Sequence, residues 1–109
     1  MKVWQRSIDL SVAIYSLTRD FPSEELYGLT SQLRRAAVSI ASNIAEGYGR
    51  VTAGEYRHFV GIARGSTLEL QTQPVIAERL GLGRAESIHE VNELSHEVGK
   101  MLWSLGRKL

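Results

Sequence analysis

The sequence has no cysteine, and that absence excludes several kinds of site at once. Without a thiol there is no disulfide framework, no thiolate nucleophile and no cysteine-based zinc site. Long apolar runs are missing too, because the longest uncharged helical stretch, residues 36–45, is about half of the roughly 20 residues that span a bilayer. Charges at Lys2, Arg6 and Asp9 interrupt the segment where a signal peptide would need an apolar core. We therefore expect a cytoplasmic protein with no membrane partner.

Proline is scarce as well, and no segment alternates apolar and polar residues as a strand would. Apolar residues instead recur three and four positions apart, the spacing of one helix face, and glycine and proline separate the periodic segments. The pattern predicts four helices, near residues 2–20, 25–48, 53–80 and 85–107. Short connections between them favour an all-α, antiparallel, up-down-up-down four-helix bundle. With 43% hydrophobic and 23% charged residues, we expect one domain over residues 1–109.

Local signals indicate where several helices begin and end. Thr52 and Glu55 form a capping box, in which the hydroxyl and the carboxylate each bond a free amide at a helix start. Gly47 and Gly49 are expected to stop the second helix, and Gly81-Leu82-Gly83 to close the third.

Two features concern the course of the middle helices. The second helix has candidate starts between Ser23, followed by two glutamates, and Thr30, which comes just after Gly28. Pro74 lies inside the third helix, where it removes a backbone hydrogen bond and crowds the carbonyl of Leu70. We therefore expect a bend near Pro74.

The first helix carries more apolar surface than one core can use. Its large apolar residues form two stripes, Val3, Leu10, Ile14 and Leu17 on one and Trp4, Ile8, Val12 and Tyr15 on the other. Apolar and small residues together cover roughly 200° of the helical wheel, whereas a bundle helix needs about 100° facing its core. We expect the excess to form a subunit interface in a homo-oligomer.

The net charge of +1 hides a basic stretch over residues 26–65, which holds five arginines and only two glutamates. Arg57 and Arg64 are two helical turns apart on one face, at roughly 10 Å, and such a rigid face can contact phosphates. The candidate residues for binding RNA or DNA are Arg34, Arg35, Arg50, Arg57 and Arg64. The alternative is a solvated surface whose arginines pair within the chain, as Arg35–Glu46 or Arg34–Glu69.

Other candidate chemistry does not assemble into a site. Two Glu-x-x-His pairs, Glu86 with His89 and Glu93 with His96, match a motif of di-iron bundles, but both lie on one helix, opposite its apolar seam. His58 has no serine, cysteine or aspartate placed to form a nucleophile–base pair. We therefore expect no enzymatic activity, no cofactor and no metal centre.

Several segments resemble one known family. They are Phe21-Pro22, Glu25, Gly28-Leu29-Thr30, Gln32 to Ala36, Ser39-Ile40, Asn43-Ile44-Ala45-Glu46-Gly47, Gly65-Ser66, Glu69-Leu70 and Ala77 to Gly81, with Trp4 and Tyr15 at the start. The pattern resembles the bacterial four-helix-bundle family that is also called the 23S rRNA intervening-sequence protein family. The resemblance spans nearly the whole chain, and Asn-Ile-Ala-Glu-Gly is its most specific part. Pro74 departs from the leucine-type residue of the family.

This resemblance implies a left-handed antiparallel bundle, assembled into a homopentameric ring without known enzymatic activity. Some relatives resemble the accessory protein of diversity-generating retroelements, which binds nucleic acid and a reverse transcriptase. At the motif positions, Arg34, Arg35, Asn43 and Glu46 are expected to hold the fold and the ring together. Two functions follow as hypotheses: a nucleic-acid-binding adaptor with little sequence preference, and a protein-interaction scaffold that binds no nucleic acid.

Overall fold

The computed structural model describes all 109 residues and contains helices but no strands, which confirms the all-α class. Four α-helices make up the molecule: α1 (Lys2–Thr18), α2 (Leu29–Tyr48), α3 (Ala53–Arg79) and α4 (Ala85–Lys108). A short 3₁₀ helix, η1 (Ser23–Glu25), lies between the first two. None of these helices combines the length and the apolar content that a membrane span requires.

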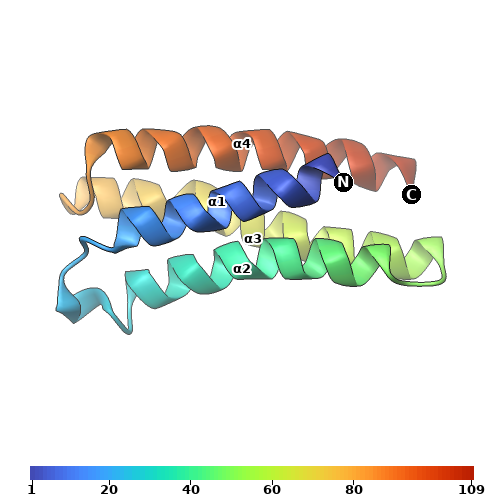
Figure 1. Cartoon of the computed structure of the whole chain (residues 1–109), viewed down its shortest axis with the longest axis horizontal. Coiled ribbons are helices and arrows are strands. Elements are labelled where there is room, and N and C mark those ends of the chain that lie inside the picture. The colour runs from blue at the N-terminus through green and yellow to red at the C-terminus, as the bar shows by residue number, and fades with distance from the viewer.

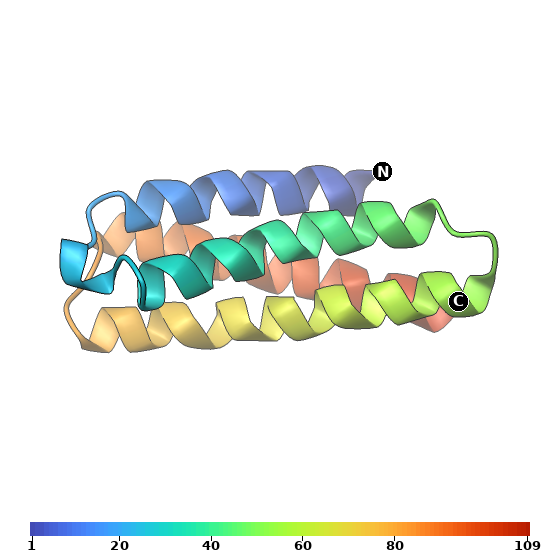
Figure 2. The ribbon, with the colours of Figure 1, turned by 90° about the horizontal axis from the view of Figure 1, so that it is seen from below.

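The four helices lie side by side in an elongated body of 43 × 23 × 18 Å. Helix α1 packs against α2 and α4, and α3 packs against the same two, whereas the backbones of the diagonal pairs, α1 with α3 and α2 with α4, do not approach one another. Figures 1 and 2 show successive helices running in opposite directions, with α1 and α3 at opposite corners. This arrangement gives each helix two neighbours and leaves one side of each exposed.

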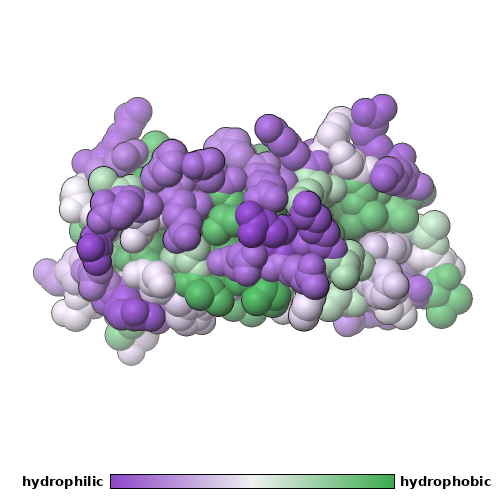
Figure 3. Space-filling view, turned by 45° about the horizontal axis from the view of Figure 1, so that its top comes forward, coloured by the Kyte–Doolittle hydropathy of each residue, from purple (hydrophilic) through white to green (hydrophobic).

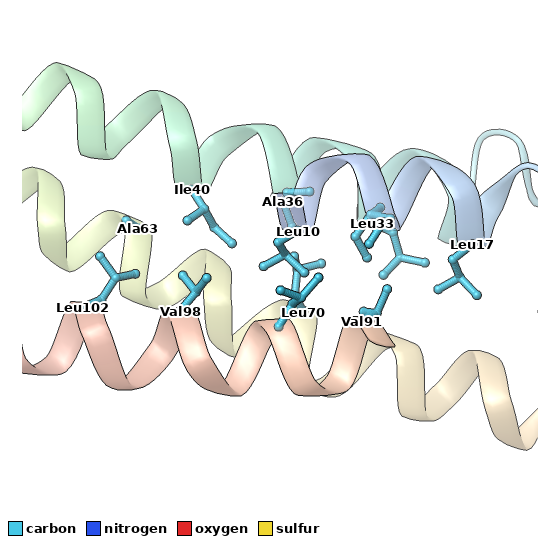
Figure 4. Close-up of a cluster of buried hydrophobic side chains, with 14 of the residues drawn as sticks. Leu10, Leu17, Leu33, Ala36, Ile40, Ala63, Leu70, Val91, Val98 and Leu102 are labelled. Carbon is cyan, nitrogen blue, oxygen red and sulfur yellow. The ribbon is translucent and has the colours of Figure 1, made fainter. Parts of the chain in front are cut away.

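The core is built from one apolar stripe of each helix. Buried side chains from all four helices point into the same interior in Figure 4. The predicted stripes supply most of them: Leu10, Ile14 and Leu17 from α1, Leu33, Ala36, Ile40 and Ile44 from α2, Val60, Ala63, Leu70 and Ala77 from α3, and Ile88, Val91, Val98 and Leu102 from α4. The core residues thus recur at spacings of three and four along each helix. For α1, which has two apolar stripes, the structure decides which one faces the core.

The start of α2 differs from the prediction of residue 25. Residues Ser23–Glu25 form the separate 3₁₀ turn, and the non-helical backbone of Gly28 (φ −112°, ψ −115°) separates it from α2. The carboxylate of Glu25 accepts a hydrogen bond from the amide of Leu29 at 3.1 Å, so it caps α2 from outside the helix. The helix begins at Leu29 because this side chain satisfies a free amide there.

Both ends of α3 follow the predicted signals. The hydroxyl of Thr52 accepts from the amide of Glu55 at 3.1 Å, while the Glu55 carboxylate accepts from that hydroxyl rather than from a backbone amide. At the other end Gly81 has φ of +75°, and the amides of Gly81 and Leu82 donate to the carbonyls of Glu78 and Ala77. This pair of bonds is a Schellman motif, in which a left-handed glycine closes the helix.

Helix α3 runs without a break from Ala53 to Arg79 with Pro74 inside it. The ribbon of α3 shows no sharp bend along its length in Figure 2, so the bend expected near Pro74 is wrong. Pro74 is buried, and the helix continues on both sides of it despite the missing backbone amide.

Gly47 also has a different role from the one predicted. It lies inside α2 and is buried, whereas the helix ends at Tyr48 with Gly49 in a right-handed conformation (φ −83°). A Cβ on Gly47 would stand 2.8 Å from the Cβ of Phe59, a distance that real side chains do not tolerate. Gly47 is thus a point of close approach between α2 and α3 rather than a stop.

Helix α1 keeps its second apolar stripe outside the core. Trp4 is 41% exposed, Ile8 38%, Val12 62% and Tyr15 42%, whereas Leu10 and Ile14 are fully buried. At one end of the stripe, a hollow between α1 and α2 is lined by five apolar or aromatic residues, Met1, Trp4, Ile44, Ala45 and Tyr48. We call Trp4, Ile8, Val12 and Tyr15 the α1 apolar stripe.

Candidate nucleic-acid interface

The five arginines singled out in the sequence do not form one surface. Arg34 points toward α1, where its Nε donates to the hydroxyl of Thr18 at 2.9 Å and its guanidinium lies 4.5 Å from the ring centre of Tyr15. These contacts join α1 to α2 within the chain. The guanidinium of Arg34 is therefore occupied by contacts that stabilise the fold.

Arg35 and Arg50 are engaged as well, although not in the pairs that the sequence suggested. Arg35 lies 3.8 Å from the Glu69 carboxylate on α3. Arg50 donates to Glu46 at 2.6 Å and lies 4.9 Å from the ring centre of Phe59. The expected pairs Arg35–Glu46 and Arg34–Glu69 do not form, because Arg50 takes Glu46 and Arg35 takes Glu69.

Arg57 and Arg64 both reach the carboxyl-terminal part of α4. The guanidinium of Arg64 lies 4.7 Å from the ring centre of Trp103, and Arg107 approaches the same ring at 6.0 Å. Arg57 donates to the backbone carbonyl of Leu109. Helices α3 and α4 are thus aligned so that two arginines of one lie beside an arginine and a tryptophan of the other.

The two helix segments that meet here contain no acidic residue. Residues 56–68 and 98–109 hold only the basic residues Arg57, Arg64, Lys100, Arg107 and Lys108. Lys100, Trp103 and Arg107 follow one another at spacings of three and four, so they share one side of α4. We call Arg57, Arg64, Trp103 and Arg107, all of them exposed, the α3–α4 basic surface. Lys100 lines the groove between α1 and α4 instead.

Neighbouring carboxylates make their polar contacts elsewhere in the chain. Glu55 accepts from Thr52, Glu69 faces Arg35, and Glu97 accepts from Arg6. No cation of the α3–α4 basic surface has a side-chain carboxylate at ion-pair distance. The positive charge of this region is therefore available to an anionic ligand.

The groove between α1 and α4 has a different electrostatic character. Asp9, Glu90, Glu93 and Glu97 line it with Arg6 and Lys100, and Figure 3 shows hydrophilic side chains across most of this face. Arg6 donates to Glu97 at 2.7 Å and to Asp9 at 2.8 Å. The bond from Arg6 holds the pKa of Glu97 below its ordinary value, and the bonds to Glu97 and Asp9 raise the pKa of Arg6. Charges in this groove are mixed, and Arg6 pairs with two of its carboxylates.

The two Glu-x-x-His pairs lie on the exposed side of α4, as their position opposite the seam predicted. His89 pairs with Glu93 at 2.6 Å, one turn away, and Nδ1 of His96 lies 2.7 Å from the carbonyl of Asn92. No group of three or more histidine, aspartate or glutamate side chains is arranged to hold a metal ion. The polar side of α4 is thus occupied by local contacts along the helix.

A sequence model of the 23S rRNA-intervening sequence protein family matches residues 1–104. The chain belongs to this family. A crystal structure from Bacteroides thetaiotaomicron, of a protein with unknown function from the S23 ribosomal protein family, is similar to it with a TM-score of 0.87. That protein is 23% identical, and the match covers 96% of this chain and 95% of the other. Among curated proteins, none matches.

The motif residues of this family member make contacts within the chain. The Asn43 amide donates to the carbonyl and hydroxyl of Ser39, and the hydroxyl of Ser66 on α3 donates to the same Ser39 hydroxyl. Arg34, Arg35 and Glu46 are engaged in the contacts already described. The specific part of the family pattern thus coincides with the packing of α2 on its neighbours.

The sequence patterns did not single out Trp103, which the structure places on the α3–α4 basic surface. Its spacing from Lys100 and Arg107 was a usable signal, because the three fall on the side of α4 opposite the apolar seam. Its contact with Arg64 was not readable, since that contact depends on how α3 and α4 are aligned along their lengths. This family member therefore has an aromatic ring at the centre of its basic surface.

Proposed function

We propose that the protein is a non-enzymatic, homo-oligomeric adaptor of the cytoplasm that binds RNA or DNA with little sequence preference. One observation carries the proposal: the α3–α4 basic surface has three exposed cations and no side-chain carboxylate at ion-pair distance. Cations on rigid helices bind the phosphate backbone, which positions a nucleic acid without reading its sequence. Repetition of this surface in an oligomer would multiply its charge.

The test is a gel-shift titration with RNA and DNA at low and high salt. We expect binding at low salt that weakens steeply, by roughly 0.7–0.9 log units in affinity per phosphate contact for each log unit of salt. The double variant Arg57→Glu/Arg64→Glu is expected to lose binding while keeping its helicity and its oligomeric mass, since exposed charges contribute little to folding.

The matched control reverses two exposed arginines outside the surface, Arg35→Glu/Arg84→Glu, whose side chains are 65% and 70% exposed. Both double variants change the net charge equally, so only the location differs. Equal loss in the control would mean that total charge, and not this surface, drives binding. Full binding by Arg57→Glu/Arg64→Glu would show the arginines to be misassigned, and absence of wild-type binding at low salt would discard the adaptor.

The α1 apolar stripe supports the oligomeric part of the proposal. A second copy of the chain is the occupant we propose, because four large side chains of α1 stay exposed in a helix whose other stripe already fills the core. Five subunits is the number that the family resemblance implies, and a closed ring is the expected result of a head-to-tail contact that repeats.

The same stripe favours a second candidate function, a protein-interaction scaffold without nucleic acid. An exposed row of large apolar side chains marks a protein-binding surface. A reverse transcriptase is one partner that the resemblance implies. The protein can be co-expressed with the products of neighbouring genes and purified, and the proteins that bind it can then be identified. Run in parallel with the gel shift, this experiment separates the two functions.

A further inference from the structure

We propose that the α3–α4 basic surface is a site for single-stranded rather than duplex nucleic acid, with an unpaired base stacked on the indole of Trp103. The inference rests on the proposed function and adds the class of ligand. It is carried by the placement of one aromatic ring among the cations.

Trp103 is held in place but not covered. Its side chain is 51% exposed, although tryptophan is among the largest apolar surfaces that a protein can bury. Arg64 from α3 lies 4.7 Å from the ring centre, and Arg107 on its own helix lies farther away, at 6.0 Å. The closer arginine fixes the ring through a cation–π contact, while the more distant one is readily displaced by a ligand.

The surroundings of the ring leave space for a nucleotide. Gly61 and Gly65, three residues before and one residue after Arg64, are exposed and have no atom within 4 Å of a Cβ position. No side chain rises from α3 at these two places. A nucleic-acid strand that approaches Arg64 and Trp103 therefore meets no protruding side chain at these two positions of α3.

The chemistry favours an unpaired base. Every base has a π-face that can stack on an indole, and this contact tolerates any sequence, in agreement with phosphate-directed binding. In a duplex those faces are already stacked on neighbouring base pairs. An indole fixed on the side of a helix between arginines reaches a base face only when that base is free, whereas the arginines reach phosphates of either form.

The chain has an optical probe at the site, because it contains two tryptophans, Trp103 and Trp4, which lies on α1. Trp4→Phe leaves Trp103 as the single reporter, and Trp103→Phe leaves Trp4. We expect a 12-nucleotide oligo(dT) to quench the emission of the Trp4→Phe protein at low salt and to leave the emission of the Trp103→Phe protein unchanged. The duplex of oligo(dT) with oligo(dA) is expected to quench neither.

Affinities measured by anisotropy of labelled oligonucleotides complete the test. Trp103→Ala is expected to weaken oligo(dT) binding by about 5- to 150-fold, the range for one stacked base, and duplex binding by less than about twofold. Trp103→Phe keeps an aromatic face and should recover most of the loss. Circular dichroism and light scattering on the same variants check that the fold and the mass are unchanged.

The outcomes separate the two proposals. If the wild type binds neither oligonucleotide at low salt, the adaptor function fails and this inference fails with it. If single strand and duplex bind equally and Trp103 emission does not respond, the inference alone is overturned and the adaptor stands. If Trp103→Ala dissociates the oligomer, the ring belongs to a contact between subunits, and the stacking site is overturned.

Discussion

Two arginines that lie over aromatic rings show how much the surroundings of a residue decide its role. Arg34 lies over Tyr15 and also bonds the buried Thr18, so its guanidinium joins two helices of the fold. Arg64 lies over Trp103 with no hydrogen-bonding partner in the chain, and its donors stay free for a ligand. The residue type and the cation–π contact are the same. The hydrogen bond to Thr18 thus distinguishes Arg34, which holds the fold together, from Arg64, which is a candidate binding residue.

The ion pair of Arg6 with Glu97 makes a prediction at the residue scale. Because the pair lowers the pKa of Glu97 below its ordinary value of 4.5, its contribution to stability is present above that pH and is lost as the pH falls through the lowered value. Glu97→Gln should therefore unfold at a lower temperature than the wild type at pH 7, and the two should converge once the pH has fallen below the lowered pKa of Glu97. Thermal unfolding followed by circular dichroism measures this.

Glu78→Gln is the control for this pH effect, since Glu78 is exposed and has no ion pair. It should follow the wild type over the same pH range. A constant difference between wild type and Glu97→Gln from pH 7 to below the lowered pKa would contradict a role for the charge.

At the scale of the helix, Gly47 and Gly61 make opposite predictions for the same substitution. Gly47→Ala places a methyl group 2.8 Å from the Cβ of Phe59, where α2 meets α3, and should destabilise the protein by about 1–3 kcal/mol. Gly61→Ala meets nothing within 4 Å in an exposed helix and should stabilise it by about 0.5–1 kcal/mol. Chemical denaturation measures both, and equal effects would refute close packing at Gly47.

Helices show what the sequence could and could not predict. The core stripes were predictable because the spacing of apolar residues within one helix is a local property. The start of α2 was not, since two candidate caps compete and the carboxylate of Glu25 decides between them. The role of Gly47 depends on Phe59, which a turn and another helix bring beside it. Trp103 was missed for the same reason: its partner Arg64 lies on another helix.

At the scale of the molecule, the α1 apolar stripe makes the prediction of a homo-oligomer. Ile8→Glu/Val12→Glu introduces two charges on exposed apolar positions and should reduce the mass in solution to that of a monomer while preserving helicity, because neither side chain belongs to the core. Light scattering at micromolar concentration measures the mass.

The control for the oligomer carries the same two charges at exposed polar positions of α1, as Gln5→Glu/Ser16→Glu. It should keep the wild-type mass. A wild type that is already monomeric at this concentration would contradict the oligomer itself.

The square arrangement of the helices also has a consequence during synthesis of the chain. Helix α1 is made first, but one of its two neighbours is α4, and Arg6 meets its partner Glu97 only 91 residues later. At about 5–20 residues per second, a ribosome needs roughly 5–20 s to supply that partner, whereas a helix forms in about a microsecond. The rim of α1 beside α4 carries Arg6, Asp9, Val12, Ala13 and Ser16. A nascent α1–α2 pair therefore keeps this rim, and the part of the core that α4 covers, exposed to solvent until the last helix emerges.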